Sequence, residues 1–300
     1  MKKDETKKHQ ILLYYKYINI EDPEALKISQ RELCEKLGLL GRIIVAEEGI
    51  NGTLEGTVEN TEAYISEMKK DERFADIVFK KSNGDGDSFP RLSVKNRPEI
   101  VSLKLGDQDI NPNDFTGERL TADELHKWFE EDKDFIMVDM RNDYEYEVGK
   151  FDKSIHPKLR NFRDLSTMSD ELEDYKDKTV VTYCTGGVRC EKASGLLKKK
   201  GFKDVYQLHD GMVTYMEKYP AKNFKGSLFV FDKRQTMYFE DEKDHEIIGV
   251  CGHCKKPAER MRNCADTKCN KKYIGCKDCV ESDRSRECPV CEKKKMKVNI

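Results

Sequence analysis

The chain contains 300 residues, more than the roughly 100 to 200 residues of a single domain, so we expect two or three domains. Hydrophobic residues make up 37% of it, enough for packed cores, and no apolar run approaches the ~20 residues that span a bilayer. The net charge of −2 and the absence of such a run exclude a strongly basic protein and a helical membrane protein. The first five residues lack the apolar segment of a signal peptide, so we expect a cytoplasmic location.

The first third of the chain predicts a ferredoxin-like domain. Turn-forming Gly49-Ile50-Asn51-Gly52 separates two β-rich stretches and predicts a hairpin. The order of the expected elements is β-α-β-β-α-β, which is that of ferredoxin-like folds, and we place this domain at residues 1–110. The expected strands are residues 11–18, 42–46, 53–56 and 77–79, the expected helices are residues 23–37 and 63–74, and an extended stretch covers residues 92–105.

The middle of the chain predicts a rhodanese-like parallel α/β domain at residues 111–223. A linker rich in Pro, Asn, Asp and Gly opens it, and Thr121 with Glu124 forms a capping box at the start of a helix. Strands and helices then alternate, which is typical of a parallel sheet. The expected strands are residues 135–139, 179–183 and 205–208, and the expected helix before the last of them covers residues 191–200.

A cysteine loop, Cys184-Thr185-Gly186-Gly187-Val188-Arg189, lies directly after the expected strand 179–183. Reacting groups collect at the carboxyl ends of parallel strands. The two glycines let the backbone curl so that its N–H groups surround one anion, and Arg189 adds a positive charge, so the loop favours a Cys184 thiolate. We predict that Cys184 is a nucleophile, provided that its sulfur is reachable and the N–H groups face it. The alternative is a buried cysteine before a helix cap.

Three further groups of residues near the loop have two interpretations each. Asp139 and Arg141, at the end of the neighbouring strand, either brace the loop through a charged hydrogen bond or form a plain surface pair. Cys190 either resolves an oxidised Cys184 or is a small packing residue, which we favour. His209 either faces the site or, as we prefer, serves only its own loop backbone.

The loop and its continuation, Cys190-Glu191-Lys192-Ala193-Ser194, resemble the rhodanese domain of the tRNA uridine hydroxylase family. Segments 48–53, 94–101 and 138–147 resemble the same family, so the resemblance covers roughly residues 10 to 290. It implies oxygen-dependent hydroxylation of the wobble uridine of tRNA at C5, with tRNA as partner and molecular oxygen as co-substrate. The chain contains no flavin, NAD or haem motif.

Two chemistries for Cys184 remain open within this resemblance. In the first, the thiolate adds to C6 of uracil, which makes C5 reactive toward an oxidant. In the second, Cys184 carries a persulfide and delivers sulfur, as in ordinary rhodaneses. A third and weaker interpretation is a non-catalytic, zinc-bearing adaptor, which has no need for the complete loop.

The C-terminal part, residues 224–300, comprises a connector with two aromatic strands, at 228–231 and 237–239, and a small cysteine-rich domain. Short spacings let paired thiolates reach one tetrahedral ion, so eight cysteines predict two structural zinc sites. Sequential and interleaved pairings both fit, and His253 is an alternative ligand. The predicted ligands are Cys251, Cys254, Cys264, Cys269, Cys276, Cys279, Cys288 and Cys291.

A basic tail offsets the acidic remainder of the chain. Residues 251–300 contain 14 Lys or Arg and 7 Asp or Glu, a charge of +7 before any thiolate–zinc correction. Charge alone does not indicate an RNA partner, and tRNA follows only from the resemblance. No membrane partner is expected, and the sequence carries no signal for an oligomeric state. The candidate tRNA contacts are the basic tail itself and Arg91, Lys95, Arg97, Lys153, Lys158, Arg160 and Arg163.

Overall fold

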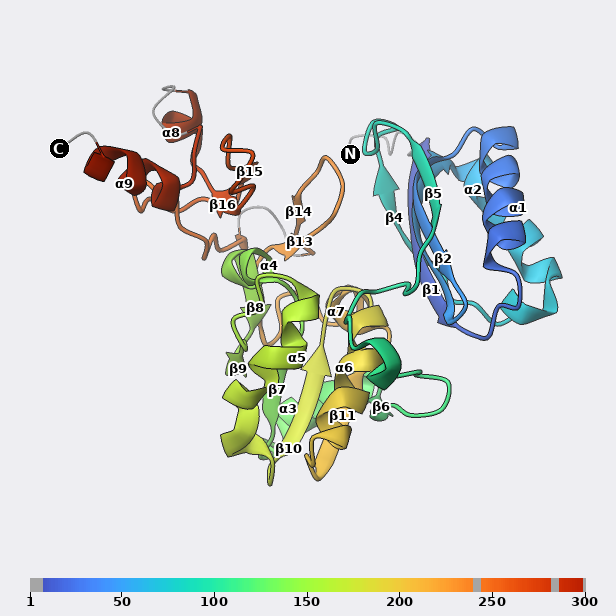
Figure 1. Cartoon of the computed structure of the whole chain (residues 1–300), viewed down its shortest axis with the longest axis horizontal. Coiled ribbons are helices and arrows are strands. Elements are labelled where there is room, and N and C mark those ends of the chain that lie inside the picture. The colour runs from blue at the N-terminus through green and yellow to red at the C-terminus, as the bar shows by residue number, and fades with distance from the viewer. Residues whose placement is uncertain (1–7, 240–243, 282–285, 299–300) are drawn as a thin grey trace.

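A computed structural model of the chain describes residues 8–239, 244–281 and 286–298. The first five residues, from which we expected no signal peptide, lie outside these ranges. Figure 1 shows an N-terminal sheet domain, a central α/β domain and a C-terminal module joined through a small hairpin. None of the helices in the described part of the chain has the length and apolar character needed to cross a membrane.

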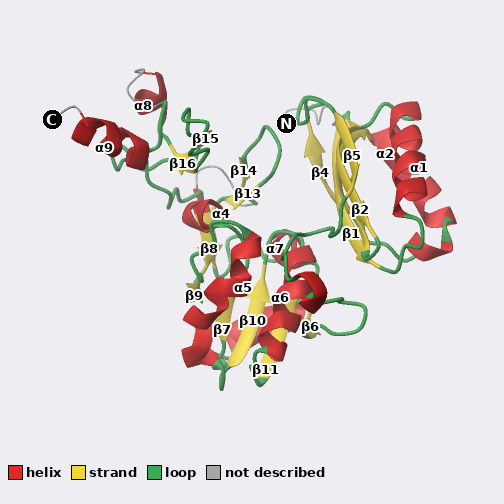
Figure 2. Ribbon diagram, viewed as in Figure 1, coloured by secondary structure: helices red, strands yellow, loops and turns green. Residues whose placement is uncertain are grey.

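The N-terminal domain has the predicted ferredoxin-like architecture. Its sheet has the order β4-β1-β3-β2-β5, in which β5 joins β2 in parallel and the other neighbours are antiparallel. Helices α1 and α2 lie on one face of this sheet (Figure 2). The elements are β1 (His9–Tyr17), α1 (Pro23–Lys36), β2 (Leu40–Ala46), β3 (Gly49–Thr57), α2 (Val58–Lys70), β4 (Lys80–Gly84) and β5 (Leu92–Asn96).

Alternation along β1 gives the two faces of this sheet different tasks. Leu12 and Tyr14 are buried in the core beneath the helices. Leu13 points to the other face and packs against a core cluster of the central domain. Because successive side chains of a strand point to opposite faces, one strand serves both the domain core and the domain interface. The prediction of a strand at residues 77–79 was wrong by three residues, since pairing with β1 begins at Lys80.

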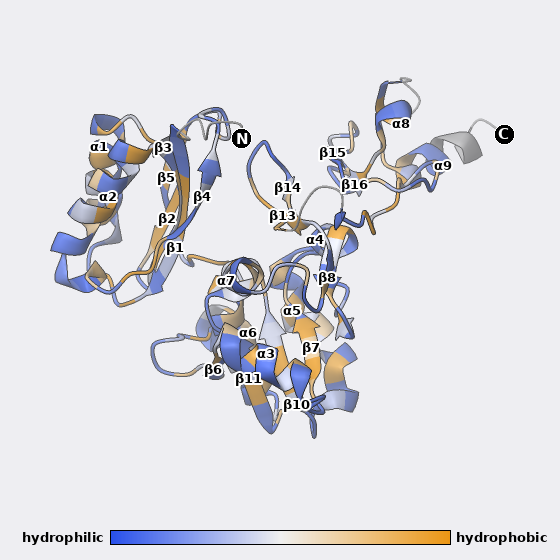
Figure 3. Ribbon diagram, turned by 180° about the vertical axis from the view of Figure 1, so that it is seen from behind, coloured by the Kyte–Doolittle hydropathy of each residue, from blue (hydrophilic) through white to orange (hydrophobic). Residues whose placement is uncertain are grey.

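The central domain has the predicted parallel sheet, with the order β6-β11-β10-β7-β9 and every neighbour parallel. In Figure 3 strand β7 is strongly hydrophobic, as expected for a strand in a sheet covered on both faces. Its elements are β6 (Glu118–Leu120), α3 (Ala122–Glu130), β7 (Ile136–Asp139), α4 (Asp143–Val148), β8 (Gly149–Phe151), β9 (Ser154–Ile155), α5 (Leu165–Met168), β10 (Thr179–Tyr183), α6 (Val188–Lys199), β11 (Asp204–Leu208) and α7 (Gly211–Lys218).

Helix α3 begins as the sequence predicts, whereas helix α6 begins earlier than predicted. Thr121 caps α3, and the predicted capping box with Glu124 is present. Helix α6 begins at Val188, three residues before the predicted start, because the glycine pair ends the loop at Gly187. Arg189 and Cys190 therefore belong to the first turn of α6.

The C-terminal part begins with β12, which pairs with β8 of the central domain. Strands β13 and β14 form a short hairpin where two aromatic strands were expected, and β15 and β16 pair within the cysteine-rich module. The divisions after residues 110 and 223 stay predictions. The elements are β12 (Phe224–Gly226), β13 (Leu228–Phe229), β14 (Thr236–Met237), β15 (Met261–Asn263), β16 (Lys272–Ile274), α8 (Lys277–Glu281) and α9 (Pro289–Val298).

A buried lysine joins the N-terminal and central domains. Lys192, on α6, is fully buried, and its Nζ lies 2.7 Å from Glu48, 2.9 Å from Glu99 and 2.7 Å from Asp109. Burial disfavours the ammonium ion, but hydrogen bonds to Asp109 and Glu48 outweigh it and raise the pKa of Lys192. One cation thus holds three carboxylates of the predicted N-terminal domain against the helix that follows Cys184.

Lys192→Met is expected to destabilise the chain by about 3 kcal/mol or more, because breaking a buried ion pair leaves uncompensated charges. Urea unfolding of the full chain measures this change. Lys203→Met is the matched control, since Lys203 pairs with Asp177 on the exposed surface and its loss is expected to cost less than about 1 kcal/mol. Equal stabilities of the two variants would contradict the proposed role of Lys192.

Candidate active site

The loop between β10 and α6 surrounds the Cys184 sulfur with main-chain donors. The N–H of Gly187 donates to Cys184 Sγ at 3.2 Å. Gly187 has a φ of +101°, a conformation that glycine adopts without strain. A side chain at Gly186 would press on Leu13, and one at Gly187 would meet the Tyr15 hydroxyl. The glycine pair therefore allows both the curled loop and the close approach of β1.

The Cys184 thiol ionises easily in this setting. Burial opposes ionisation, but a hydrogen bond from Cys190, the charge of Arg189 and the N–H groups of Arg189 and Gly187 outweigh it and lower the pKa of Cys184 to about 6. Burial and the neighbouring Cys184 raise the pKa of Cys190 well above its ordinary value. The opposite shifts favour a Cys184 thiolate beside a protonated Cys190 thiol.

This pair predicts a pH dependence. Activity that needs the Cys184 thiolate is expected to be high at neutral pH and to fall as the pH drops through about 6, where the sulfur becomes protonated. Cys190→Ala removes one donor, so the acid limb of the kcat/KM profile is expected to move to higher pH. The measurement is this profile for both proteins. An acid limb that stays at the same pH would contradict the role of Cys190 as a donor.

Arg189 is tied to a carboxylate that we did not single out from the sequence. Its Nη1 and Nη2 donate to Glu145 Oε1 and Oε2 at 2.7 and 2.9 Å, and Nη2 also donates to Thr185 at 3.2 Å. Both Arg189 and Glu145 are buried. Glu145 on α4 thus fixes the guanidinium beside the cysteine loop. In the sequence, Glu145 was indicated only by its position within segment 138–147, which is part of the family resemblance.

Asp139 and Arg141 form a fully buried bidentate pair, so the interpretation as a surface pair was wrong. Arg141 Nε and Nη2 donate to the Asp139 carboxylate, and Nη2 also donates to the carbonyl of Gly149. These bonds connect the end of β7 to β8, whereas the loop itself is held by Glu145 and Arg189. A bracing role for Asp139 and Arg141 at Cys184 therefore stays a prediction.

A cavity of about 730 Å³ lies between the N-terminal domain and the cysteine loop. Cys184, Thr185, Gly186, Val188 and Arg189 contribute to one wall. The outer face of the N-terminal sheet and the segment after β5 contribute Leu13, Tyr15, Arg42, Asn51, Arg97 and Lys104. Cys184 is among the residues that line this cavity, but it has 0% exposed surface, so the condition of a reachable sulfur is not met in this arrangement of the N-terminal domain and the loop. The burial expected of the alternative, a buried cysteine before a helix cap, is observed.

The eight C-terminal cysteines form two separate groups in an interleaved order. Cys251, Cys254, Cys276 and Cys279 form the first group, and Cys264, Cys269, Cys288 and Cys291 form the second. Within each group all sulfur atoms lie within 4.8 Å of one another. The sulfurs of Cys254 and Cys276 are 3.5 Å apart, and those of Cys269 and Cys288 are 3.7 Å apart. Tetrahedral bonds of about 2.3 Å place sulfurs roughly 3.8 Å apart, so both groups fit one metal ion each.

Comparisons with known proteins agree with each part of this arrangement. Residues 9–100 match a family model described as the UPF0176 acylphosphatase like domain, residues 121–218 match a rhodanese-like domain, and residues 225–293 match a rhodanase C-terminal model. The chain is 45% identical to the tRNA uridine(34) hydroxylase of Bacillus licheniformis, over 93% of this chain and 85% of the relative. Proteins of the same name from Oceanobacillus iheyensis and Staphylococcus carnosus are 44% and 42% identical, over 84% and 92% of their lengths.

The chain belongs to the tRNA uridine(34) hydroxylase family. The resemblance stated from the sequence is therefore confirmed. The three matched segments also confirm the predicted succession of an N-terminal domain, a rhodanese domain and a C-terminal cysteine-rich part in this family member.

The basic residues singled out from the sequence lie in different places in this hydroxylase family member. Of these residues, Arg97 lines the Cys184 cavity. Lys153 pairs with Asp132 and Lys158 with Glu171, both on the surface, and Arg160 donates to the carbonyl of Cys269. Two cations of the cavity wall, Arg42 and Lys104, were missed. Arg42 was detectable, because a charged residue between Gly41 and Ile43 of a strand must point away from the core.

His209 does not line the Cys184 cavity, and His253 does not belong to the cysteine groups. His209 lines a neighbouring cavity with Tyr15 and Glu191, and its Nε2 lies 3.5 Å from Asp210. His253 Nδ1 lies 2.9 Å from Glu292, and His253 is not a member of either cysteine group. The cysteines alone complete both groups of four.

Proposed function

We propose that this protein hydroxylates the wobble uridine of tRNA at C5. Relatives that share 42% to 45% of its residues over most of their length carry the name tRNA uridine(34) hydroxylase. The observation that carries the proposal is the Cys184 thiolate at the wall of a cavity wide enough for a nucleoside. Arg42, Arg97 and Lys104 around the same cavity supply positive charge for the RNA backbone.

The proposed chemistry begins with attack of the Cys184 thiolate on C6 of uracil. A C6–S bond forms and the electron pair of the C5–C6 double bond moves toward C5 and O4, which makes C5 nucleophilic. C5 then reacts with an oxidant derived from molecular oxygen. Loss of the C5 proton and departure of the thiolate restore the double bond. Overall, one dioxygen, two electrons from a cellular reductant and two protons give 5-hydroxyuridine and water.

The residues around Cys184 have defined tasks in this proposal. The N–H of Gly187 and the charge of Arg189 stabilise the thiolate before attack and after departure. Glu145 keeps Arg189 in place, so Arg189 does not need to reorganise during the reaction. Cys190 is a hydrogen-bond donor and part of the domain core.

We further propose that the two cysteine groups hold one structural zinc ion each. All-thiolate groups of four favour zinc, and such closed sites have no open position for substrate. The N–H of Cys288 donates to Cys264 Sγ at 3.2 Å, a contact that typically supports a thiolate ligand. Zinc supplies folding energy to a module with a small apolar core of its own.

Comparison of modified nucleosides in tRNA tests the proposed activity. Bacterial cells that lack this protein are expected to lose 5-hydroxyuridine and its derivatives from tRNA, and a plasmid copy is expected to restore them. Mass spectrometry of digested tRNA makes the measurement. An unchanged nucleoside profile in the deletion strain would exclude the activity in that organism.

A persulfide-based sulfurtransferase is the second candidate, favoured by the rhodanese-like domain over residues 121–218. The same ring of donors would also stabilise a Cys184 persulfide. Mass spectrometry of the Cys184 peptide separates the two candidates, because a persulfide adds one sulfur atom that reductant removes. A non-catalytic adaptor would have no use for a cysteine whose pKa is lowered to about 6.

A further inference from the structure

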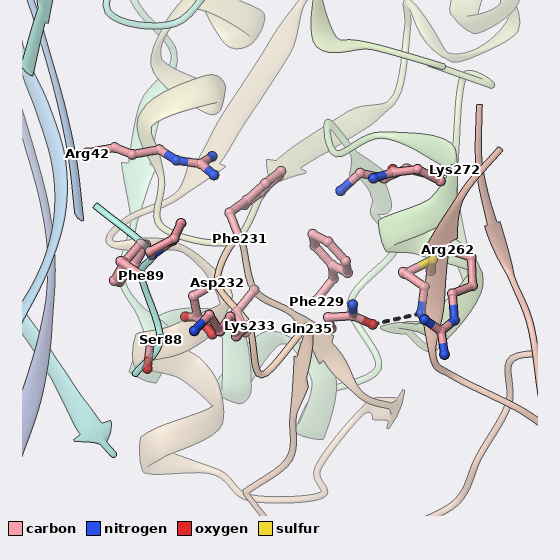
Figure 4. A pocket seen from close by; sticks show the side chains of 14 residues that line it. Arg42, Ser88, Phe89, Phe229, Phe231, Asp232, Lys233, Gln235, Arg262 and Lys272 are labelled. Atoms are coloured by element: carbon pink, nitrogen blue, oxygen red, sulfur yellow. Dashed lines mark hydrogen bonds between the residues drawn. The ribbon is translucent and has the colours of Figure 1, made fainter. Parts of the chain in front are cut away.

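A second cavity lies beside the first, among the N-terminal domain, the β13–β14 hairpin and the cysteine-rich module. Its volume is about 240 Å³. Figure 4 shows Arg42 and Lys272 entering it from opposite sides, with the ring of Phe231 between them. Arg42 belongs to β2, Phe231 follows β13 and Lys272 begins β16. Three parts of the chain that are distant in sequence therefore supply the polar and aromatic groups of one space.

The cavity carries positive charge that the surrounding carboxylates do not neutralise. Arg42, Arg262 and Lys272 form no ion pair with any carboxylate of residues 8–239, 244–281 or 286–298. Asp232, the acidic residue in the wall, already accepts hydrogen bonds from Nε and Nη2 of Arg234. Gathering like charges costs free energy unless an anion lies between them.

Lys272 is held in place without a carboxylate. Its Nζ lies 4.8 Å from the ring centre of Tyr144 and 4.9 Å from that of Phe229, so the rings hold the ammonium group by cation–π contact. Burial lowers the pKa of Lys272, Glu145 raises it and Arg42 lowers it, which places Lys272 and Arg42 within each other's field. Arg262 Nε is buried and has no hydrogen-bond partner among the described atoms. These donors are available to an anionic ligand.

The second cavity adjoins the first. Arg42 and Phe231 line both of them. Phe231 as a residue is 44% exposed, whereas the neighbouring Phe229 is 2% exposed, so Phe231 offers aromatic surface to a ligand. A chain molecule with one unit at Cys184 would reach the second cavity with the next unit. A nucleotide supplies a flat base that can stack on the Phe231 ring and a phosphate that can bind the cations of the wall.

We propose that the second cavity binds the nucleotide next to the target uridine, with its base on Phe231 and its phosphate between Arg42 and Lys272. This inference rests on the proposed function, because the RNA must place a uridine at Cys184. It also gives the cysteine-rich module a task, since Arg262 and Lys272 lie on its β15–β16 hairpin. The two metal groups then hold an RNA-binding hairpin against the active cavity.

Binding of an RNA hairpin with the tRNA anticodon loop tests the charge contribution. Lys272→Met removes the ammonium group but keeps an apolar side chain against the rings, and it is expected to weaken binding about tenfold. The slope of log K against log salt is expected to fall by about 0.7, the value of one single-strand phosphate contact. Lys272→Arg is expected to retain most of the affinity. Lys203→Met, a surface control with the same charge change, is expected to bind like the unmodified protein.

An RNA with an abasic site tests the base contact. Two hairpins are compared: one lacks the base of the nucleotide on the 5′ side of the uridine, and the other lacks the base of the nucleotide on the 3′ side. One of them is expected to bind the unmodified protein about tenfold more weakly, and the same RNA is expected to lose little further affinity with Phe231→Leu. Metal content, measured for every variant, shows whether the module is intact.

The outcomes separate this inference from the proposed function. If the unmodified protein hydroxylates the hairpin but Lys272→Met, with full metal content, matches Lys203→Met in affinity and salt slope, the second cavity does not bind the neighbouring nucleotide. If both abasic RNAs bind as tightly as the complete hairpin, the stacking contact on Phe231 is overturned. A protein that neither binds nor modifies the RNA would overturn the proposed function itself.

Discussion

Cys184→Ser is expected to reduce formation of 5-hydroxyuridine by at least about a thousandfold. A serine hydroxyl stays protonated near neutral pH, whereas the donors around Cys184 lower the pKa of the thiol to about 6. The variant therefore lacks the ionised nucleophile although the loop retains its shape. The measurement is hydroxylation of unmodified tRNA by the purified protein with oxygen and a reductant present.

Cys34→Ser is the matched control for this substitution. Cys34 is fully buried in the core of the N-terminal domain, and burial raises the pKa of its thiol to about 12. We expect this variant to lose some stability and to keep its activity at a temperature where it is folded. Activity of Cys184→Ser within tenfold of the unmodified protein would show that the sulfur is not the nucleophile.

Removal of metal is expected to unfold the cysteine-rich module. Structural zinc contributes an apparent binding free energy of about 10–16 kcal/mol in small all-ligand sites, more than this module can supply from its own packing. The core cluster around the second group consists mainly of its own ligands, together with Tyr273. Two zinc ions for each chain are expected by elemental analysis. After chelation, hydrogen exchange is expected to become fast over residues 251–291.

Single substitutions assign the metal to its groups. Cys264→Ser is expected to lose one of the two ions, because it belongs to one group only. Cys34→Ser is expected to keep both. Protection of the rhodanese domain is expected to persist in all of these proteins, since its sheet is formed without the module. A folded module after complete removal of metal would contradict a structural role for zinc.

The order of elements and the cysteine loop were predictable because they depend on local signals. A β-rich composition indicated β1, a capping box indicated α3, and the position of the glycines indicated the loop after β10. The end of α2 and the start of β4 were less certain, since the pairing that begins at Lys80 is set by β1. Such boundaries depend on a partner strand that is distant in the sequence.

The contacts between distant segments were not predictable from one sequence. Glu145, Lys192 and Arg42 are common charged residues, and their tasks follow only from burial beside particular partners. The interleaved order of the cysteine groups likewise depends on how β15 and β16 fold back. Spacing alone allowed both orders, because either one places neighbouring cysteines at a single ion.

The close approach of β1 to the cysteine loop has a consequence for chemical survival. A thiolate that works beside oxygen is exposed to stepwise oxidation, and its sulfinic and sulfonic acids are generally not repaired. Leu13 and Tyr15 lie against Gly186 and Gly187, and Cys184 has no exposed surface. The N-terminal domain thus acts as a shield for the sulfur between turnovers. A rhodanese domain separated from it would be expected to inactivate itself in air.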